Sequence, residues 1–319
     1  MTFTYNDVYV KDTATIAGPY EKKGPLKKYF DKTFDDLYYA EDSWEKAEIK
    51  SVKESLKLLH KKVGIKRKEV DVILGGDLLN QIAATTYGAY NFSKCFLGLY
   101  GACSTSVEAM ILGSVLIDAK RVKNAIVTVS SHNMAAEKQF RNPTEYGAPK
   151  PKSATFTATG SASMLLTKEK TDIKVESSTI GQIIDLNQND PNDMGKVMAP
   201  AAIDTIKRHL KDLNRKPDYY DLIVTGDLGL YGKEILKDYM LEEYDLDLKD
   251  NYNDCGVMLY DLKEQEECLA GGSGPVCSAL VSFGYIYHEM KKKNLKRVLI
   301  VATGALFSPT MVYQKENIY

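Results

Sequence analysis

A cysteine stands where a predicted strand turns into a predicted helix. Cys103 follows Leu99-Tyr-Gly-Ala and precedes Ser-Thr-Ser-Val-Glu-Ala, a run of small and apolar residues. A thiol at a helix N-terminus is favoured as the nucleophilic thiolate, and the free N–H groups there can also hold an anion. The alternative is that Cys103 is a small buried hydrophobic residue, as free cysteines usually are. The local pattern leaves both interpretations open.

Three polar residues follow buried strands. Asp77 ends Val-Ile-Leu-Gly-Gly, Asp227 ends Leu-Ile-Val-Thr-Gly, and His132 lies just after the strand Ala125–Val129. Strand ends of this kind carry ligand groups in α/β sheets, so Asp77 and His132 are candidate ligand-binding residues. The alternatives are turn caps for the two aspartates and a hydrogen-bonded structural role for His132.

The remaining cationic candidates divide into two groups. Arg141 precedes the Pro-rich stretch Pro149–Lys152, which we interpret as a lid or rim loop, and an arginine there suits carboxylate recognition. Lys150 and Lys152, within that stretch, are expected at the surface. Three histidines lie in or beside amphipathic helices near lysines and are expected to be solvated: His60, His209 and His288.

The chain repeats itself at an offset of 150 residues. Asp71–Leu78 matches Asp221–Leu228, and the apolar positions of the preceding helices match at the same offset. A second pair joins Val107–Ser131 to Pro275–Gly304, each a small-residue helix, a basic turn and an apolar strand. The sequence therefore predicts two copies of one βα unit.

Apolar strands alternating with helices predict sheets that are covered on both faces. The helices 104–117 and 278–287 are apolar nearly all round, so they belong between layers. We therefore expect an α/β fold with a five-layer αβαβα plan, made of a first half over residues 1–168 that carries Cys103 and a second half over 169–319. The alternative is a single doubly wound sheet.

Charge and residue content argue against several classes of function. The net charge of −1 argues against a nucleic-acid partner. Five cysteines without a CxxC pair or metal-ligand spacing predict a reducing compartment and no metal site. The N-terminus shows no signal peptide, and no apolar run reaches the ~20 residues of a membrane span, so a soluble chain is expected.

The turn at Gly101–Ser106 resembles the nucleophile turn of thiolases and 3-oxoacyl-acyl-carrier-protein synthases. Within that superfamily the whole chain most resembles the stage V sporulation protein AD family, thiolase-like dipicolinic-acid-binding proteins of spore-forming bacteria. Further segments carry this resemblance: Gly76-Asp77, Ser131–Asn133, Gln139–Tyr146, Thr159–Leu166, Ala270–Pro275 and Ala302–Ser308.

The chain departs from the active enzymes at two loops of the second half. These enzymes bring two histidines, or a histidine and an asparagine, towards the cysteine, whereas this chain has Thr225-Gly226-Asp227 and Gly271-Gly272-Ser273 at those places. A general acid–base and an oxyanion donor each contribute factors of about 10² or more, so their loss predicts little acyl transfer.

The resemblance implies a binding protein for dipicolinic acid, with or without calcium, and no cofactor. The implied ligand-binding residues are Cys103, His132, Asp77, Arg141, Gly272 and Ser273, with Tyr100, Phe140 and Phe307 as a flat apolar wall. It also implies sporulation, a peripheral place at the spore inner membrane with other stage V sporulation A proteins, and a homodimer joined at the apolar strand Cys95–Tyr100. The alternatives are an acyltransferase or 3-oxoacyl synthase with Cys103 as nucleophile and His132 as base, and a structural subunit with a vestigial pocket.

Overall fold

Helix α1 (Trp44–Val63) and helix α5 (Met194–Asp212) begin 194 − 44 = 150 residues apart, each behind a side-chain cap. The Ser43 hydroxyl accepts a hydrogen bond from the Lys46 N–H (3.3 Å), and the Asp193 carboxylate accepts one from the Lys196 N–H (3.2 Å). Helix α1 stops at Gly64, whose left-handed φ of 68° suits glycine. The predicted repeat is thus present in the helix starts themselves.

The computed structural model describes residues 1–140, the backbone of residue 141, and residues 149–305 and 307–319. In the first half, one sheet of the described residues follows the order β3-β2-β8-β6-β4-β5, with β9 also paired to β2. Strands β6, β4 and β5 are parallel, and β8 is antiparallel to β6 and β2. Its strands are β2 (Tyr9–Ala17), β3 (Lys32–Thr33), β4 (Val72–Gly76), β5 (Cys95–Gly98), β6 (Asn124–Ser131), β8 (Gly160–Thr167) and β9 (Ile173–Lys174).

In the second half, the parallel order β12-β11-β14 repeats the order β5-β4-β6. These strands are β11 (Leu222–Thr225), β12 (Tyr252–Asp254) and β14 (Val298–Val301). Two small pairs complete the described strands: β1 (Thr2–Thr4) with β10 (Ser177–Thr179), and β7 (Phe156–Thr157) with β13 (Gly272–Ser273). The predicted boundary at residues 168 and 169 falls between β8 and β9.

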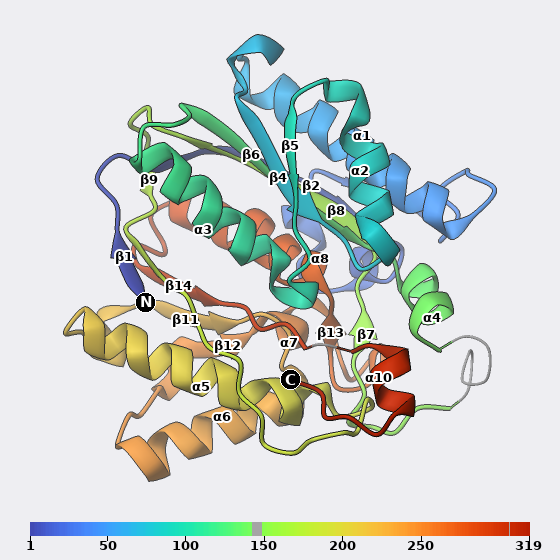
Figure 1. Cartoon of the computed structure of the whole chain (residues 1–319), viewed down its shortest axis with the longest axis vertical. Coiled ribbons are helices and arrows are strands. Elements are labelled where there is room, and N and C mark those ends of the chain that lie inside the picture. Colours follow the sequence, from blue (N-terminus) through green and yellow to red (C-terminus); the bar gives the residue numbers. More distant parts are fainter. Residues whose placement is uncertain (142–148, 306) are drawn as a thin grey trace.

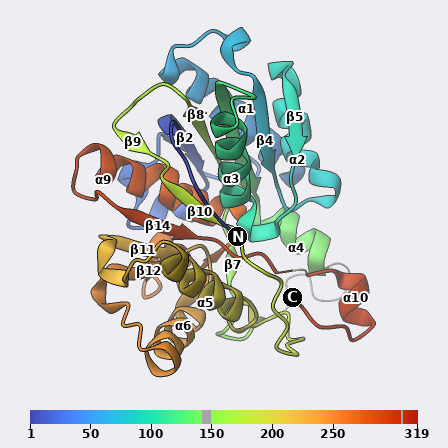
Figure 2. The same cartoon turned by 60° about the vertical axis from the view of Figure 1, so that its left-hand side comes forward.

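Helices form three layers around the two sheets (Figures 1 and 2). Helices α1 and α2 cover the outer face of the first sheet, α5 and α6 that of the second, and α3 and α8 lie between them. The remaining helices are α2 (Ala83–Ala89), α3 (Thr105–Asp118), α4 (Asn133–Arg141), α6 (Gly229–Tyr244), α7 (Cys255–Leu259), α8 (Pro275–Ala279), a π-helical turn (Leu280–Ile286), α9 (Tyr287–Lys291) and α10 (Pro309–Tyr313). The five-layer α/β prediction is confirmed, and the single-sheet alternative is wrong.

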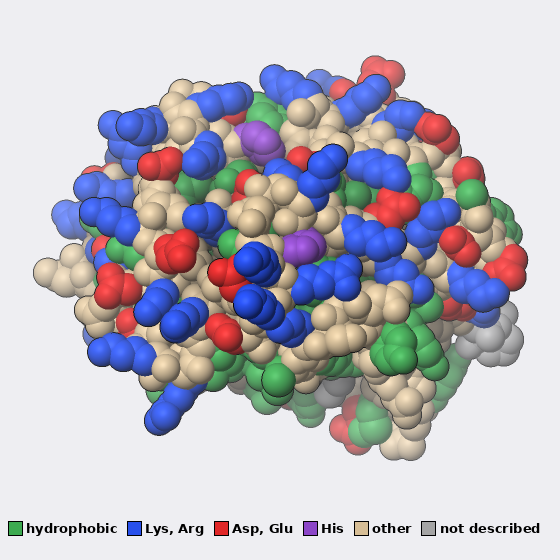
Figure 3. All heavy atoms as spheres, turned by 90° about the horizontal axis from the view of Figure 1, so that it is seen from above, with side chains coloured by type: hydrophobic (Ala, Val, Ile, Leu, Met, Phe, Trp, Pro, Cys, Tyr) green, Lys and Arg blue, Asp and Glu red, His purple; other side chains and the backbone are tan. Residues whose placement is uncertain are grey.

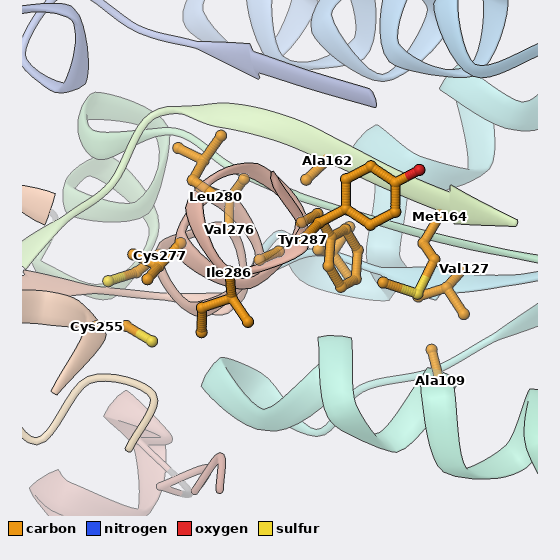
Figure 4. Close-up of a cluster of buried hydrophobic side chains, with 14 of the residues drawn as sticks. Ala109, Val127, Ala162, Met164, Cys255, Val276, Cys277, Leu280, Ile286 and Tyr287 are labelled. Atoms are coloured by element: carbon orange, nitrogen blue, oxygen red, sulfur yellow. The ribbon is translucent and has the colours of Figure 1, made fainter. Parts of the chain in front are cut away.

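The middle layer contains the largest core. Figure 4 shows Val276 of α8 close to Leu280 and Ile286 of the π-helical turn, and all three belong to one buried cluster with Met164 of β8. One polar contact crosses the same layer, because the Thr13 hydroxyl of β2 donates to the Phe283 carbonyl at 2.7 Å. Burial of apolar surface on both sides of α8 therefore fixes the second half against the first.

Candidate functional site

The turn that carries Cys103 is fixed by its own hydroxyl groups. After β5 the chain reaches Ala102, whose φ of 48° is left-handed, and enters a short 3-10 turn at Ala102–Ser104 before α3. Thr105 Oγ1 accepts from the Gly101 N–H (3.1 Å) and donates to the Ala102 carbonyl (2.7 Å). Ser104 Oγ donates to the Gly101 carbonyl at 2.7 Å. The residues Ser-Thr after the cysteine thus hold it in position before the helix begins.

A glycine of the second half closes against this turn. A Cβ atom on Gly304 would lie 2.1 Å from the Gly101 carbonyl oxygen. This distance is a steric clash with backbone, so a residue with a side chain would not fit at position 304. Glycine at this place lets the segment after β14 touch the cysteine turn. The site is therefore built from both halves of the chain.

The polar neighbours of Cys103 come from the second half. Cys103 Sγ lies 3.8 Å from Ser273 Oγ, and Ser273 Oγ donates to Asp227 Oδ2 at 3.1 Å. The Gly274 N–H donates to the same carboxyl oxygen at 3.0 Å. Asp227 is buried, and its Oδ1 has no hydrogen-bond partner among the described residues. The cysteine thus faces a hydroxyl and a carboxyl group.

Burial and this carboxyl group determine the protonation of the site. Burial, and then the charge of Asp227, raise the pKa of the Cys103 thiol well above its usual value. Burial also raises the pKa of the Asp227 carboxyl to about 7, with a further upward contribution from the charge of Asp254. Of the two interpretations of Cys103, this raised pKa favours a protonated thiol over a helix-stabilised thiolate.

Ser273 and Gly272 belong to the short strand β13, which pairs with β7 of the first half. Ser273 lines the cavity described below, as predicted for a site residue. Gly272 is buried behind it, where an added Cβ would lie 2.8 Å from Cys277 Sγ. Gly272 therefore contributes backbone and close packing rather than a wall of the site.

Cys103 opens onto a cavity of about 380 Å³. Tyr100, Phe140 and Phe307 line it, as expected for the flat apolar wall, and the rings of Phe140 and Phe307 lie 5.6 Å apart. Lys150 and Glu137 also line it and form an ion pair with each other. Lys150 is mostly buried, so the expectation of a surface position for it is wrong, whereas Lys152 is exposed.

Two further predicted ligand residues, besides Gly272, do not line this cavity. The Asp77 carboxylate accepts from the N–H groups of Leu79 (2.9 Å) and Thr85 (2.7 Å), so it acts as the turn cap that was the alternative. His132 Nε2 bonds to the Leu37 carbonyl (2.8 Å), and burial lowers its pKa to about 4. His132 is therefore neutral and hydrogen-bonded to the backbone of Leu37. It neither carries a charge nor lines this cavity.

Other sequence expectations have mixed outcomes. Arg141 is the last residue of α4, and its side chain lies outside the described residues. His209 is buried between Tyr220 Oη (2.7 Å) and Thr179 Oγ1 (2.8 Å), so the expectation that it is solvated is wrong. Its spacing from Ile206 places it on the buried face of α5, a signal that the sequence contained. No sequence pattern around Lys150 or Glu137 predicts their ion pair.

Comparison with known proteins places the chain in a family. The family model of stage V sporulation protein AD matches residues 1–319. The chain belongs to the stage V sporulation protein AD family. It is 46% identical over 312 residues to the Bacillus subtilis (strain 168) stage V sporulation protein AD, covering 98% of this chain and 91% of that protein.

Solved structures show the same fold at low identity. A 3-oxoacyl-[acyl-carrier-protein] synthase III from Aquifex aeolicus VF5 covers 93% of this chain and 96% of its own, with 12% identity and a TM-score of 0.53. The cerulenin-bound form of OleA from Xanthomonas campestris covers 95% of this chain and 94% of its own, with 10% identity and a TM-score of 0.59. These similarities show a thiolase-like fold.

The described residues contain neither a membrane-spanning helix nor a cluster of metal ligands. None of their helices combines the length and the apolar character needed to cross a bilayer. They also contain no group of three or more His, Cys, Asp or Glu side chains that could hold a metal ion.

Proposed function

We propose that the cavity beside Cys103 binds dipicolinic acid, free or as its calcium chelate, and that the protein supports uptake of this solute into the developing spore. The observation that carries the proposal is the cavity itself, which combines an aromatic wall with the partly buried Lys150–Glu137 pair. The family resemblance supplies the identity of the ligand, and membership of a sporulation protein family agrees with its biological setting.

The size and lining of the cavity suit a small planar acid. Its volume of about 380 Å³ lies at the small end of ligand pockets, and aromatic side chains dominate one wall. The ring of dipicolinic acid would lie against Phe140 and Phe307. Cys103 and Ser104 also line the cavity, just before the first turn of α3, where the helix dipole favours an anion.

The charged pair gives the two forms of the ligand different partners. Lys150 can donate to a carboxylate of the free dianion, because burying such a group without a partner would be very costly. Glu137 could bind the calcium ion of the chelate, because calcium takes oxygen ligands and the Glu137 carboxylate can supply one. The same cavity can therefore bind either form: Lys150 contacts the free dianion, and Glu137 contacts the calcium ion of the chelate.

Acyl transfer with Cys103 as nucleophile has less support. Such a reaction needs a thiolate and a general base, whereas burial and the charge of Asp227 raise the pKa of this thiol well above its usual value. His132, the expected base of that alternative, is bonded to Leu37. A binding role needs neither group to react.

Assembly and location are part of the proposal. We infer a homodimer through the edge of β5, where Cys95 and Leu97 are exposed and an unpaired apolar edge would otherwise be a liability. We also infer a peripheral place at the spore inner membrane beside other stage V sporulation A proteins. Basic side chains gather on the face shown in Figure 3, and the end of α1 and the loop after it expose Lys61, Lys66 and Arg67, which suit an anionic surface.

The test is binding measured by calorimetry and by thermal shift with dipicolinate and benzoate. A ligand at 100 times its Kd should stabilise the fold by about 2.7 kcal/mol, and benzoate, with one carboxylate and no ring nitrogen, should shift the melt much less. Lys150→Ala should weaken dipicolinate binding roughly tenfold or more, since it removes a charge-assisted hydrogen bond of about 1.5–3 kcal/mol.

Lys152→Ala is the matched control, because Lys152 is two residues away but exposed. It should bind like the parent protein. Equal shifts with dipicolinate and benzoate, or equal losses in the two lysine variants, would contradict the proposal. A radiolabelled acetyl group transferred from acetyl-coenzyme A to Cys103, and absent in Cys103→Ala, would favour the acyltransferase instead.

A further inference from the structure

One serine of the proposed site lies between the cavity and a buried acid. Ser273 lines the cavity beside Cys103, and its hydroxyl donates to Asp227 Oδ2 at 3.1 Å. Asp227 does not itself line the cavity and is only 1% exposed. A ligand group that reaches Ser273 therefore meets a hydroxyl whose orientation depends on Asp227.

The Ser273 hydroxyl has a single hydrogen and two lone pairs, so it donates to one partner at a time. While Asp227 is a carboxylate, that hydrogen points to Asp227, and only lone pairs are left for the cavity. When Asp227 carries a proton, its carboxyl can donate to Ser273 Oγ, and the serine hydrogen is free to donate to a ligand. A carboxylate ligand would be repelled in the first state and bound in the second.

The surroundings of Asp227 favour its neutral form. Its Oδ2 accepts from Ser273 and from the Gly274 N–H at 3.0 Å, whereas its Oδ1 has no hydrogen-bond partner within the described ranges. A buried carboxylate with one oxygen unpaired is costly, and the cost is smaller for a neutral carboxyl group. The hydrogen-bond geometry therefore supports a proton on this acid.

A second buried acid, Asp254 at the end of β12, has more donors than Asp227. It accepts from the Thr225 hydroxyl (2.7 Å) and from the N–H groups of Leu228 (2.9 Å) and Gly229 (3.1 Å). Burial raises the pKa of Asp254 to about 6. Burial, with a contribution from the charge of Asp254, raises the pKa of Asp227 to about 7. Of the two acids, Asp227 is thus the one that takes up a proton near neutral pH.

The other titratable groups around the Asp227 carboxyl are thiols from three elements. Cys103 belongs to the turn before α3, Cys255 to the start of α7 and Cys277 to α8. Burial raises the pKa of the Cys255 and Cys277 thiols well above the usual value, so both stay neutral near pH 7. The charged side chains of the cavity wall, Lys150 and Glu137, form an ion pair with each other. A proton on the carboxyl is therefore what removes the negative charge next to the serine.

We propose that the cavity binds a carboxylate ligand together with one proton, which Asp227 takes up, and that the Ser273 hydroxyl then donates to the bound carboxylate. This role rests on the proposed function, in which Lys150 can contact one carboxylate of dipicolinate and the other needs a donor near Cys103. Asp227 acts through Ser273 and is a positioning residue. Affinity should be highest while Asp227 is protonated and should fall with rising pH by up to about tenfold per pH unit.

The first experiment compares two alkylating reagents of different charge and needs no dipicolinate. Iodoacetate carries a carboxylate and iodoacetamide is neutral, but both react with the Cys103 thiolate, so the ratio of their rates does not depend on the amount of thiolate. In the parent protein this ratio should fall roughly tenfold between pH 6 and pH 9, because the charge that Asp227 gains repels the anionic reagent. Peptide mass spectrometry measures both rates at each pH.

Two variants assign the change to one acid. Asp227→Asn keeps this side chain neutral at every pH, so the ratio should stay flat and should exceed that of the parent protein at pH 9. Glu21→Gln is the matched control, because burial also raises the pKa of Glu21 to about 7 but its carboxyl bonds to Thr159 and Tyr260, outside the cavity lining. It should show the same fall as the parent. A flat ratio in the parent, or a fall that persists in Asp227→Asn, overturns the proposal.

Calorimetry with dipicolinate tests the same role in the parent protein without a variant. Dipicolinate keeps both charges at pH 8, so binding should take up about one proton, seen as heats that differ between buffers of different ionisation enthalpy. Ser273→Ala should weaken binding about tenfold at pH 6.5, where the hydroxyl donates to the ligand, and change it little at pH 8.5.

The two experiments separate this role from the identity of the ligand. Dipicolinate binding that takes up no proton would overturn the role of Asp227 and leave the proposed ligand in place. Dipicolinate binding no tighter than benzoate binding, together with an alkylation ratio that falls in the parent protein and not in Asp227→Asn, would contradict the ligand and support the role of Asp227.

Discussion

Cys103 Sγ lies 3.8 Å from Ser273 Oγ, and these two atoms join the first half of the chain to the second. The buried carboxyl group of Asp227 lies next to Ser273 and accepts a hydrogen bond from its hydroxyl. A condensing enzyme needs groups here that take up a proton or donate to an oxyanion. Burial, and then the charge of Asp227, instead raise the pKa of the thiol well above its usual value, which agrees with the binding role proposed for this cavity.

The first prediction concerns the reactivity of this thiol. At pH 7.5 iodoacetamide should modify Cys103 roughly tenfold or more slowly than free cysteine in the same solution, because only the thiolate reacts. Asp227→Asn removes the neighbouring negative charge and should accelerate the modification of Cys103 alone. Peptide mass spectrometry against time measures both rates. Cys103 reacting as fast as free cysteine would contradict the protonated thiol.

The second prediction concerns catalysis. Purified protein should neither condense acetyl and malonyl thioesters nor decarboxylate malonyl thioesters above background, because no imidazole or side-chain amide of the described residues hydrogen-bonds to the Cys103 thiol. Product formation is measured by chromatography over many hours at high protein concentration. Repeated turnover that disappears in Cys103→Ala would show that this protonated thiol can still be activated.

The third prediction separates the two forms of the ligand. Glu137→Gln frees Lys150 from its ion pair, so free dipicolinate should bind at least as tightly as to the parent protein. The same variant should lose any gain in affinity that calcium gives, since an amide is a weaker calcium ligand than a carboxylate. Calorimetry with and without calcium measures both, and the exposed Glu169→Gln serves as the control. An unchanged calcium effect in Glu137→Gln would place the cation away from this wall.

The fourth prediction concerns pH and a buried carboxyl distant from Cys103. Glu21 Oε1 accepts from the Thr159 N–H at 3.0 Å and from Tyr260, and burial raises its pKa to about 7. A folded pKa above the unfolded value of about 4.3 stabilises the fold at low pH, and this contribution is lost as pH rises to about 7.

Urea unfolding from pH 5 to 8 measures that loss. The stability of the parent protein relative to Glu21→Gln should fall with a slope of up to about 1.4 kcal/mol per pH unit below pH 7 and level off above it. The comparison with the variant cancels the opposite contribution of His132, whose lowered pKa destabilises the fold as pH falls. A flat difference between the two proteins would mean that Glu21 stays charged.

The fifth prediction concerns assembly. Leu97 of β5 and Leu241 of α6 are equally exposed, at 47% and 48%. Leu97→Asp should convert the expected dimer to a monomer at micromolar concentration, whereas Leu241→Asp should leave the mass unchanged. Sedimentation or light scattering distinguishes the two. A monomeric parent protein would remove the proposed interface.

The sequence predicted the features that depend on local pattern. The repeat of helix starts, the turn at Cys103 and the small-residue middle helix follow from spacing and side-chain size, and all three occur in the structure. The sequence did not predict the positions of side chains whose hydrogen-bond or ion-pair partners are far away along the chain. His132 turns to a carbonyl in the loop at Leu37, 95 residues away, and no pattern around either residue encodes that contact. Lys150 was assigned to the surface because its burial depends on α4 and on Glu137, not on its own neighbours.

The pairing of β2 with β8 also has a kinetic consequence. Tyr9 lies opposite Thr167, and Thr13 reaches the carbonyl of Phe283, so the earliest strand is completed by late parts of the chain. Contacts between residues so distant in sequence require the loss of much chain entropy before they stabilise anything, which slows folding. During synthesis on the ribosome, the apolar face of β2 must therefore wait for most of the polypeptide to emerge. Chaperone dependence and slow refolding after dilution from denaturant are the expected signs of this order of assembly.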